Sequence, residues 1–294
     1  MTTSFRGLWL PLITPFKDGA VDYASYERLI DHYLARGVDA LFPLGTTGES
    51  PALDEAEVEQ LVERTVARAA GRVPVFVGVG GNSTGKVVKE LRRLQRHRFA
   101  GIVSVCPYYN RPSQDGLIAH FRAIADATDR QVLIYNIPYR TAVNLTNESM
   151  LELAEVPNIV GCKDSSGSIA QSLDLLTRKP QGFAVLTGED ALYFTMMANG
   201  AEGGILASSH IATERFLLVR DCFDRNDIKG ARQAWAALAP LVPQLFAEAN
   251  PMPIKYLLWR QGLIASPECR LPLTRISEAL ARRLDGLVVD SMAA

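Results

Sequence analysis

Residues 159–167 read Ile159-Val160-Gly161-Cys162-Lys163-Asp164-Ser165-Ser166-Gly167. An apolar run that ends in small polar residues and glycine predicts a buried strand that leaves the core and turns sharply. Lys163 stands at that change, so its stem would be buried while its amine reaches the rim. Partial burial would lower the pKa of this amine and leave it free to attack a carbonyl. The alternative is a solvated lysine at a strand end, and the side chains around it in space decide between the two.

The pattern of strand followed by helix repeats along the chain. Seven more short apolar runs predict strands, at residues 8–13, 40–44, 75–79, 101–106, 131–135, 183–186 and 203–207. Helical patterns follow most of them, at residues 22–36, 54–70, 83–97, 114–127, 146–153, 168–176 and 191–198, with Asp54 as an N-cap. Strands that are apolar throughout are buried on both faces, as in parallel sheets. Eight such units predict an α/β fold, the closed (β/α)₈ TIM barrel, in preference to an open sheet.

The pattern changes near residue 225. Only helical patterns follow, at residues 227–248, 253–261 and 274–283, and no Gly/Ser linker separates them from the preceding units. We therefore expect a barrel domain over residues 1–224 and a C-terminal helical region, packed on the barrel, over residues 225–294.

Composition limits the partners and the compartment. Of 294 residues, 48% are apolar and 21% charged, and the net charge of −1 offers no field to attract nucleic acid or an anionic membrane surface. The four cysteines form no CxxC pair, which predicts reduced core thiols in a cytoplasmic protein. We expect no signal peptide and no spanning helix, because the start lacks a long apolar segment and no run of eighteen apolar residues occurs.

Residue types suited to catalysis collect where barrel sites form, at the carboxyl ends of the strands. They are Thr46 and Thr47 after the second strand, Tyr108 and Tyr109 after the fourth, Tyr135 and Arg140 at and after the fifth, Lys163 at the sixth, Gly188 after the seventh and Ile205 in the eighth. One amine, several hydroxyls and one guanidinium would meet at a small mouth, which favours a catalytic amine at Lys163.

Each of these side chains has a chemical role and a plainer alternative. An amine at Lys163 can form a Schiff base with a 2-oxo acid, and the iminium then accepts the electrons left when a proton leaves the adjacent carbon. Thr46 and Thr47 can bind a carboxylate through hydroxyl and backbone N–H groups, or merely suit a turn. Tyr135 can move protons, or pack as a core tyrosine. Arg140 offers a planar fork for a second carboxylate, or is a surface arginine in a loop.

No metal or cofactor site is predicted. The four histidines are scattered, and His32, His97 and His120 fall in helical contexts that indicate structural roles. No GxGxxG followed by an acidic residue and no Walker sequence is present.

Five segments together resemble one family. They are Gly45–Ser50 (GTTGES), Pro107–Asn110 (PYYN), Tyr135–Thr141 (YNIPYRT), Gly161–Asp164 (GCKD) and Asn250–Lys255 (NPMPIK). In order and spacing, along nearly the whole chain, they are similar to the dihydrodipicolinate synthase / N-acetylneuraminate lyase family of class I pyruvate aldolases.

This resemblance implies a pyruvate Schiff base at Lys163. By matching position, Thr46, Tyr135 and Tyr109 would form a hydroxyl relay in which Tyr109 comes from a neighbouring subunit. The resemblance therefore implies a homo-oligomer, a dimer or a tetramer. The residues implied to hold pyruvate are Thr47, Gly188 and Ile205.

The second substrate is implied by Arg140, which matches the arginine that the synthases use for the carboxylate of their aldehyde. We therefore expect condensation of pyruvate with L-aspartate 4-semialdehyde to 4-hydroxytetrahydrodipicolinate, a step of lysine and diaminopimelate biosynthesis. Tyr139 and the segment 206–210 depart from the usual pattern of the synthases, so a 2-oxo-3-deoxy sugar acid is a rival substrate. A rival of another class is a catalytically idle regulatory or binding protein on the same scaffold.

Overall fold

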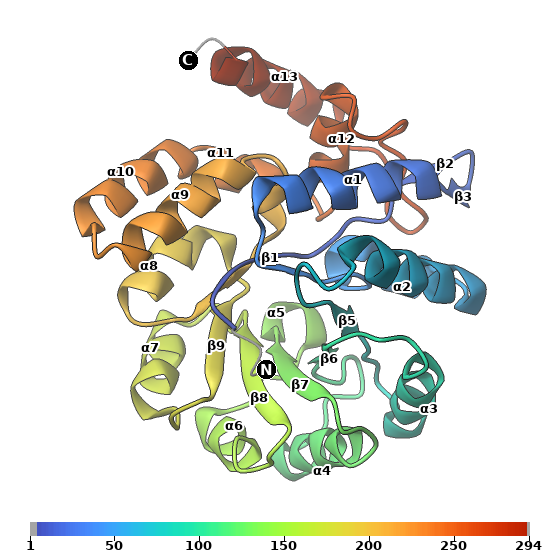
Figure 1. Cartoon of the computed structure of the whole chain (residues 1–294), viewed down its shortest axis with the longest axis vertical. Helices are drawn as coiled ribbons and strands as arrows, with labels where there is room; N and C mark the ends of the chain where they lie inside the picture. The colour runs from blue at the N-terminus through green and yellow to red at the C-terminus, as the bar shows by residue number, and fades with distance from the viewer. Residues whose placement is uncertain (1–4, 293–294) are drawn as a thin grey trace.

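A computed structural model describes residues 5–292, with side chains described for residues 5–286. Its centre is an eight-stranded parallel barrel (Figure 1). The strands are β1 (Gly7–Leu10), β4 (Ala40–Leu41), β5 (Phe76–Gly78), β6 (Gly101–Val105), β7 (Gln131–Asn136), β8 (Ile159–Asp164), β9 (Ala184–Thr187) and β10 (Gly203–Ile205). The N–H groups of Leu41 and Gly78 close the ring between β4 and β5 by donating to Pro74 and Pro43, at 3.1 and 2.9 Å. The predicted TIM barrel is confirmed.

Helices surround the strands on the outside (Figure 1). They are α1 (Tyr23–Arg36), α2 (Glu55–Ala69), α3 (Thr84–Leu94), α4 (Gln114–Ala125), α6 (Asn147–Leu153), α7 (Ile169–Arg178), α8 (Tyr193–Ala198) and α9 (Thr213–Asp224). Asp54 caps α2 as predicted. Its carboxylate accepts the Glu57 N–H at 2.8 Å, and the Glu57 carboxylate accepts the Asp54 N–H at 3.1 Å, a reciprocal capping box.

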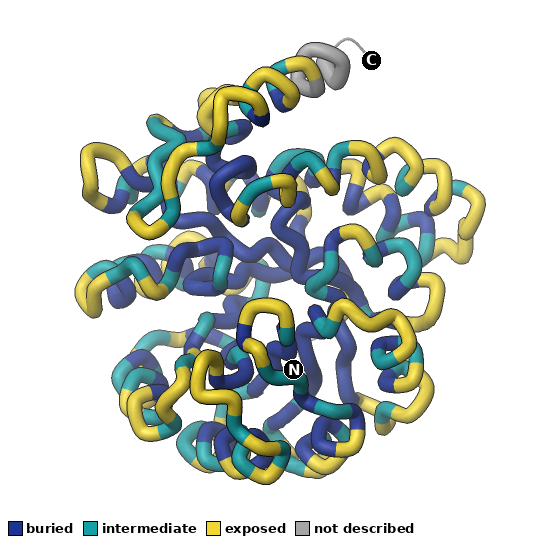
Figure 2. The backbone as a smooth tube through the Cα atoms, turned by 180° about the vertical axis from the view of Figure 1, so that it is seen from behind, coloured by how far each residue is buried: buried dark blue, intermediate teal, exposed yellow. Residues whose placement is uncertain are grey.

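The strands are buried on both faces, as their apolar sequences predict (Figure 2). Side chains that point inward fill the barrel, including Trp9, Phe42, Phe76 and Leu133. The opposite side chains of the strands pack against the helices in a larger cluster. Each fully buried Leu or Phe contributes about 1.5–3 kcal/mol relative to exposure, so the barrel gives the site a rigid frame.

Several elements differ from their predicted bounds. The helix expected over 227–248 is two helices, α10 (Ile228–Leu238) and α11 (Leu241–Leu245), separated at Pro240. Proline has no N–H to donate and its ring clashes with the preceding turn. The last helix, α13 (Glu278–Met292), begins later and ends later than expected.

Several short elements were not predicted. A hairpin, β2 (Phe16–Lys17) and β3 (Ala20–Val21), turns at Asp18-Gly19, where both residues have positive φ, 53° and 80°. Asp-Gly is a typical hairpin turn, so this signal was present in the sequence. A one-turn helix, α5 (Pro138–Thr141), follows β7, and several 3₁₀ turns, including η1 (Thr46–Gly48) and η2 (Ser50–Ala52), form the mouth of the barrel.

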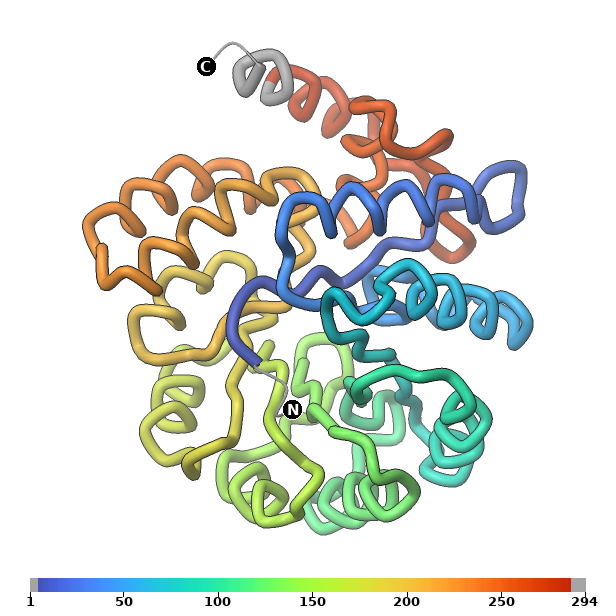
Figure 3. The backbone as a smooth tube through the Cα atoms, in the orientation of Figure 1, coloured from blue at the N-terminus to red at the C-terminus, as the bar shows by residue number. Residues whose placement is uncertain are grey.

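The C-terminal region packs on one side of the barrel. Helices α12 (Met252–Arg260) and α13 lie beyond α1 and near the β2–β3 hairpin, whereas α10 lies beside α9 (Figures 1 and 3). Phe16 of the hairpin bridges to Glu268 in the segment between α12 and α13. Within residues 5–292, no helix has the length and apolar character needed to cross a membrane.

The cysteine side chains are free thiols. Cys106, Cys162 and Cys222 are buried, as expected of core thiols, whereas Cys269 is only half-buried. The expectation of a core position is wrong for Cys269, because it lies in the irregular segment between α12 and α13, whose next residues, 270–273, line a cavity at the barrel mouth.

Candidate active site

Lys163 lies near the carboxyl end of β8, in register with Tyr135 on β7 and Leu186 on β9. It is 6% exposed, and its Nζ lies 4.2 Å from the centroid of the Tyr135 ring and 5.4 Å from that of Phe42. Among the described side chains, no carboxylate lies within ion-pairing distance of this amine. A buried amine that faces aromatic rings and lacks an anionic partner is open to reaction with a carbonyl.

Gly188 packs directly against Lys163. Its N–H donates to the Asp164 carbonyl at 2.7 Å. A Cβ at position 188 would lie 2.6 Å from Cε of Lys163 and 2.2 Å from Oγ of Ser165. The position therefore requires glycine for a steric reason, and the backbone of the loop after β9 covers the stem of the lysine.

The two threonines lie in the η1 turn that follows β4. Thr46 is half-buried and lines the mouth of the barrel, whereas Thr47 is 4% exposed. The Thr47 hydroxyl oxygen accepts a hydrogen bond from Nδ2 of Asn250 at 3.0 Å. Asn250 begins the segment 250–255, which resembles the family, and its contact with this turn was not predicted.

A cavity of about 360 Å³ opens at the carboxyl ends of the strands. Thr46 lines it from the end of β4, and Tyr135 and Arg140 line it from the end of β7. Tyr108 and Asn250 line it as well. Phe42 and Tyr135, the two rings that face Lys163, also line it. Three of the predicted site residues thus meet at one cavity, whereas Lys163, Thr47 and Gly188 do not line it. Lys163 lies against two of the rings that do, those of Phe42 and Tyr135. Thr141 and the C-terminal segment 270–273 line the same cavity and were not predicted, because only the fold places them there.

Other predicted residues lie around this cavity without lining it. Ile205 is 1% exposed and belongs to the cluster inside the barrel that also contains Phe42 and Tyr135. Tyr109 has a positive φ of 76° and an exposed fraction of 87%, so in a single chain it points into solvent.

The two segments that depart from the family pattern also lie off this cavity. Tyr139 is 63% exposed, and its ring centroid lies 5.9 Å from Cζ of Arg140. Partial burial and the neighbouring Glu189 carboxylate raise the pKa of Tyr139. In the 206–210 segment, the Ser208 N–H donates to Asp190 at 2.6 Å, and the His210 ring packs edge-on against Tyr33 at 5.3 Å. This segment therefore has a packing role in the described structure.

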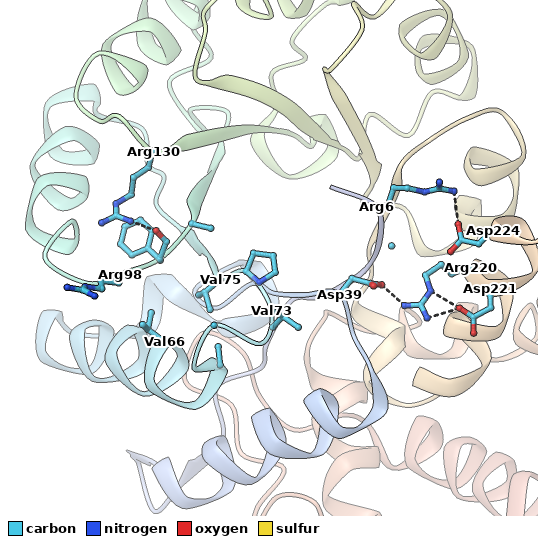
Figure 4. Close-up of a pocket in the computed structure, with 16 residues that line it drawn as sticks. Arg6, Asp39, Val66, Val73, Val75, Arg98, Arg130, Arg220, Asp221 and Asp224 are labelled. Carbon is cyan, nitrogen blue, oxygen red and sulfur yellow. Dashed lines mark hydrogen bonds and ion pairs between the residues drawn. The ribbon is translucent and has the colours of Figure 1, made fainter. Parts of the chain in front are cut away.

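A larger cavity, of about 940 Å³, lies at the amino ends of the strands (Figure 4). Arg220 there pairs with Asp39 at 2.6 Å and with Asp221 at 2.7 Å. None of the predicted site residues lines this cavity, which lies at the end of the barrel opposite to Lys163.

The histidines have structural partners. Nδ1 of His120 lies 2.9 Å from the Thr84 hydroxyl, Nε2 of His97 lies 2.5 Å from Glu59, and Nδ1 of His32 lies 2.9 Å from an Arg36 nitrogen. Within the described residues, no group of three or more His, Cys, Asp or Glu side chains is arranged to hold a metal ion.

A buried amine on a strand end against a tyrosine ring, with a threonine and a guanidinium lining the adjoining cavity, defines a class of protein, the barrel enzymes that act on carbonyl compounds through a lysine. The family follows from comparison with known proteins. The model of the dihydrodipicolinate synthetase family matches residues 4–289, and the chain belongs to that family.

Relatives match over almost their whole length. The chain is 47% identical over 280 residues to 4-hydroxy-tetrahydrodipicolinate synthase 2 of Clostridium acetobutylicum, covering 95% of this chain and 98% of the relative. It is 40% identical to the 4-hydroxy-tetrahydrodipicolinate synthase of Laribacter hongkongensis, covering 93% and 94%. The solved structure of dihydrodipicolinate synthase from Thermotoga maritima superposes with a TM-score of 0.96 at 37% identity, covering 99% of this chain and 100% of that one. The structure from Aquifex aeolicus gives 0.94 at 38% identity, covering 98% of each chain.

Proposed function

We propose that this protein is a Schiff-base lyase that condenses pyruvate with L-aspartate 4-semialdehyde to 4-hydroxytetrahydrodipicolinate. The observation that carries the proposal is the buried amine of Lys163, which faces Tyr135 and Phe42 and has no carboxylate partner among the described side chains. Membership of the dihydrodipicolinate synthetase family, and relatives named for this synthase, support the same activity.

The first half of the reaction takes place on pyruvate. Nζ of Lys163 attacks the C2 carbonyl, a C–N bond forms, and the carbonyl oxygen leaves as water to give an iminium. A proton then leaves the C3 methyl group, and its electron pair moves toward the iminium nitrogen to give an enamine. Tyr135 accepts and returns these protons, with Thr46 and a Tyr109 side chain completing the relay.

The second half joins the two substrates. C3 of the enamine attacks the aldehyde carbon, and the new alkoxide takes a proton from the relay. The amino group of the second substrate then attacks the iminium carbon and displaces Lys163, which closes the ring and frees the enzyme. In this scheme Thr47, Gly188 and Ile205 hold pyruvate, and Arg140 holds the carboxylate of the aldehyde substrate.

Two rivals have distinct requirements. A paralogue that acts on a 2-oxo-3-deoxy sugar acid would place hydroxyl-binding groups where Arg140 lines the cavity, so Arg140 favours the synthase. An idle regulatory protein on the same scaffold has no need of a buried, unpaired Lys163 beside Tyr135. We further propose that the enzyme works in the cytoplasm as a homo-oligomer, a dimer or a tetramer, without metal, nucleic acid or membrane partners.

The test is trapping with borohydride. Pyruvate plus borohydride should leave a reduced adduct on Lys163, found by peptide mass, and Lys163→Ala should abolish both the adduct and turnover. Lys86→Ala, an exposed lysine on α3, is the matched control and should label like the wild type. A coupled assay with a panel of aldehydes, aspartate semialdehyde first, identifies the second substrate. Labelling that survives in Lys163→Ala would overturn the Schiff-base assignment.

A further inference from the structure

The C-terminal helical region contacts the turn that contains Thr46 and Thr47. Three of its residues reach residues 46–57 at the mouth of the barrel, from positions about 200 residues later in the chain: Asn250, Lys255 and Arg270. Two of them, Asn250 and Lys255, are the ends of the segment Asn250–Lys255, to which the proposed reaction assigns no role.

Asn250 contacts the turn directly. It is 7% exposed, and its Nδ2 donates to Oγ1 of Thr47 at 3.0 Å. Because Asn250 also lines the 360 Å³ cavity, this bond lies at the edge of the substrate space. The bond fixes the rotamer of Thr47 and leaves its hydroxyl hydrogen free to point elsewhere.

Lys255 contacts the turn through an ion pair with Glu49. The two side chains form an ion pair in which Lys255 is 0% exposed and Glu49 is 2% exposed. The ammonium also donates to the Glu268 carbonyl at 2.9 Å and lies 4.2 Å from the centroid of the Phe16 ring. The other Glu49 oxygen accepts a hydrogen bond from the backbone N–H of Arg270 at 3.1 Å. Truncating one partner of such a buried pair leaves an uncompensated charge, which strongly favours rearrangement.

The backbone of the turn needs external support. Leu44 and Glu49, which flank Thr46 and Thr47, have positive φ of 63° and 52°. Non-glycine residues in this region are strained and persist only where their surroundings hold them. The contacts of Glu49 with Lys255 and Arg270, and the bond from the Thr14 hydroxyl to the Gly48 carbonyl at 2.7 Å, provide that support.

We propose that Asn250 and Lys255 are positioning residues of the active site, which hold the Thr46–Thr47 turn so that it binds pyruvate beside Lys163. This inference rests on the proposed function, because the turn is assigned to pyruvate there. It makes the C-terminal helical region part of the catalytic unit. It also predicts that loss of the hydrogen bond between Asn250 and Thr47 weakens pyruvate binding.

A double-mutant cycle separates positioning from general stability. Asn250→Ala removes the hydrogen bond, Thr47→Val removes its acceptor, and the double variant removes both. For each single variant we expect the pyruvate KM to rise about tenfold, as the loss of one hydrogen bond in a binding step predicts. The double variant should be no worse than Thr47→Val alone, and the rate of borohydride trapping on Lys163 should fall in parallel with pyruvate affinity.

Asn147→Ala is the matched control. Asn147 is also 7% exposed and also donates through Nδ2, to the Gln171 carbonyl and the Asp174 carboxylate at 2.9 and 2.7 Å, but it joins α6 to α7 on the outside of the barrel. We expect this variant to lower the melting temperature without changing the pyruvate KM.

A second pair of variants tests Lys255. Lys255→Met leaves Glu49 buried and unpaired, so the pyruvate KM should rise by more than for Asn250→Ala. Adding Glu49→Gln removes that charge and should recover part of the loss. If Lys255→Met does not fold, the Asn250 cycle carries the test.

The outcomes distinguish the two proposals. A wild-type protein that traps no pyruvate on Lys163 would end the proposed function. A wild type that traps pyruvate, with an Asn250→Ala variant of unchanged KM or with effects of Asn250→Ala and Thr47→Val that simply multiply, would end the positioning role alone.

Discussion

Two of the seven lysines in the chain are buried, and their surroundings assign them opposite roles. Lys255 faces a carboxylate, a carbonyl and an aromatic ring, so its charge is compensated and structural. Lys163 lies against the rings of Tyr135 and Phe42 and the backbone of Gly188. The Glu189 and Asp190 carboxylates interact with it electrostatically, but none of the described carboxylates is within ion-pairing distance. Burial alone therefore does not separate the two lysines, whereas the presence of an ion-pair partner does, and the proposed catalytic role falls to the lysine without one.

Arg140 is the residue that separates the two candidate substrates. It is exposed at the cavity, so its contact with a carboxylate would be worth about 1.5–3 kcal/mol, the range of a charged hydrogen bond. We expect Arg140→Ala to raise the KM for aspartate semialdehyde by roughly ten- to a hundredfold, while the pyruvate adduct still forms. The measurement is steady-state kinetics in the coupled assay, and unchanged aldehyde kinetics would move the assignment to the sugar-acid rival.

A substitution at Gly188 tests how closely the loop after β9 packs against Lys163. In Gly188→Ala the new methyl group would lie 2.6 Å from Cε of the lysine, so the lysine or the loop must move. A displacement near 1 Å costs about a hundredfold in rate, and we expect kcat/KM to fall by about that factor. Gly85→Ala on α3 is the control, because a Cβ there meets nothing within 4 Å. If Gly188→Ala has the same kcat/KM as the control, the loop accommodates the methyl group without displacing Lys163, and the prediction is wrong.

At the scale of elements, the helices depend on contacts that the sequence periodicity does not reveal. His120 on α4 is 3% exposed, and its ring nitrogen bonds to Thr84 at the start of α3. Burial lowers the pKa of His120 to about 4. The ring must therefore be neutral in the folded protein at pH values where an unfolded histidine already binds a proton.

This histidine predicts a pH dependence of stability. The unfolded side chain titrates near 6.5, so between pH 6.5 and about 4 the unfolded state binds more protons, and the free energy of unfolding decreases as the pH falls through that window. We expect His120→Gln to reduce the loss of stability between pH 7 and pH 5 by ~1–2 kcal/mol. Urea unfolding at both pH values measures it, and identical pH profiles for variant and wild type would contradict the assignment.

The turn at residues 44–50 shows how one element depends on another that is remote in sequence. The glycines and threonines indicated a turn, but the left-handed conformations of Leu44 and Glu49 have no local signal. Those conformations go with the ion pair between Glu49 and Lys255, which forms only when α12 docks on the barrel. Local sequence predicted that the chain turns here, and the packing of the C-terminal region sets its shape.

For the whole molecule, exposed side chains at the mouth point to more than one chain. Tyr109 and Leu271 are 87% and 80% exposed. Tyr108, which precedes Tyr109 in the sequence and lines the cavity together with Leu271, is 39% exposed. Apolar and aromatic side chains of this kind are enriched at subunit interfaces. We propose that the active unit is at least a dimer, in which Tyr109 enters the site of a neighbour.

Sedimentation and one substitution test this assembly. We expect an oligomer at assay concentrations, and we expect Tyr109→Phe to lower kcat by about a hundredfold, the range of one acid–base group, while the protein still assembles. Tyr108→Phe, which removes the adjacent hydroxyl, is the control and should retain most activity. A fully active monomer would refute the proposal that Tyr109 acts in the site of a neighbouring subunit.

The apolar runs of the sequence were enough to predict the barrel. Strands buried on both faces and helices with one apolar face are local patterns, and eight of them in succession have few ways to pack. The same order places Lys163, Tyr135 and Thr46 at one end, because all parallel strands share a direction. The family motifs by themselves indicated the chemistry.

Only the tertiary structure decided which groups meet. It separated the unpaired Lys163 from the paired Lys255, two residues that look alike in a strand or helix pattern. It also placed Asn250 against Thr47, although the two are 203 residues apart in the chain. Contacts of this kind depend on how the C-terminal helices dock, and docking is set by shape and charge over a whole surface, which no short stretch of sequence contains.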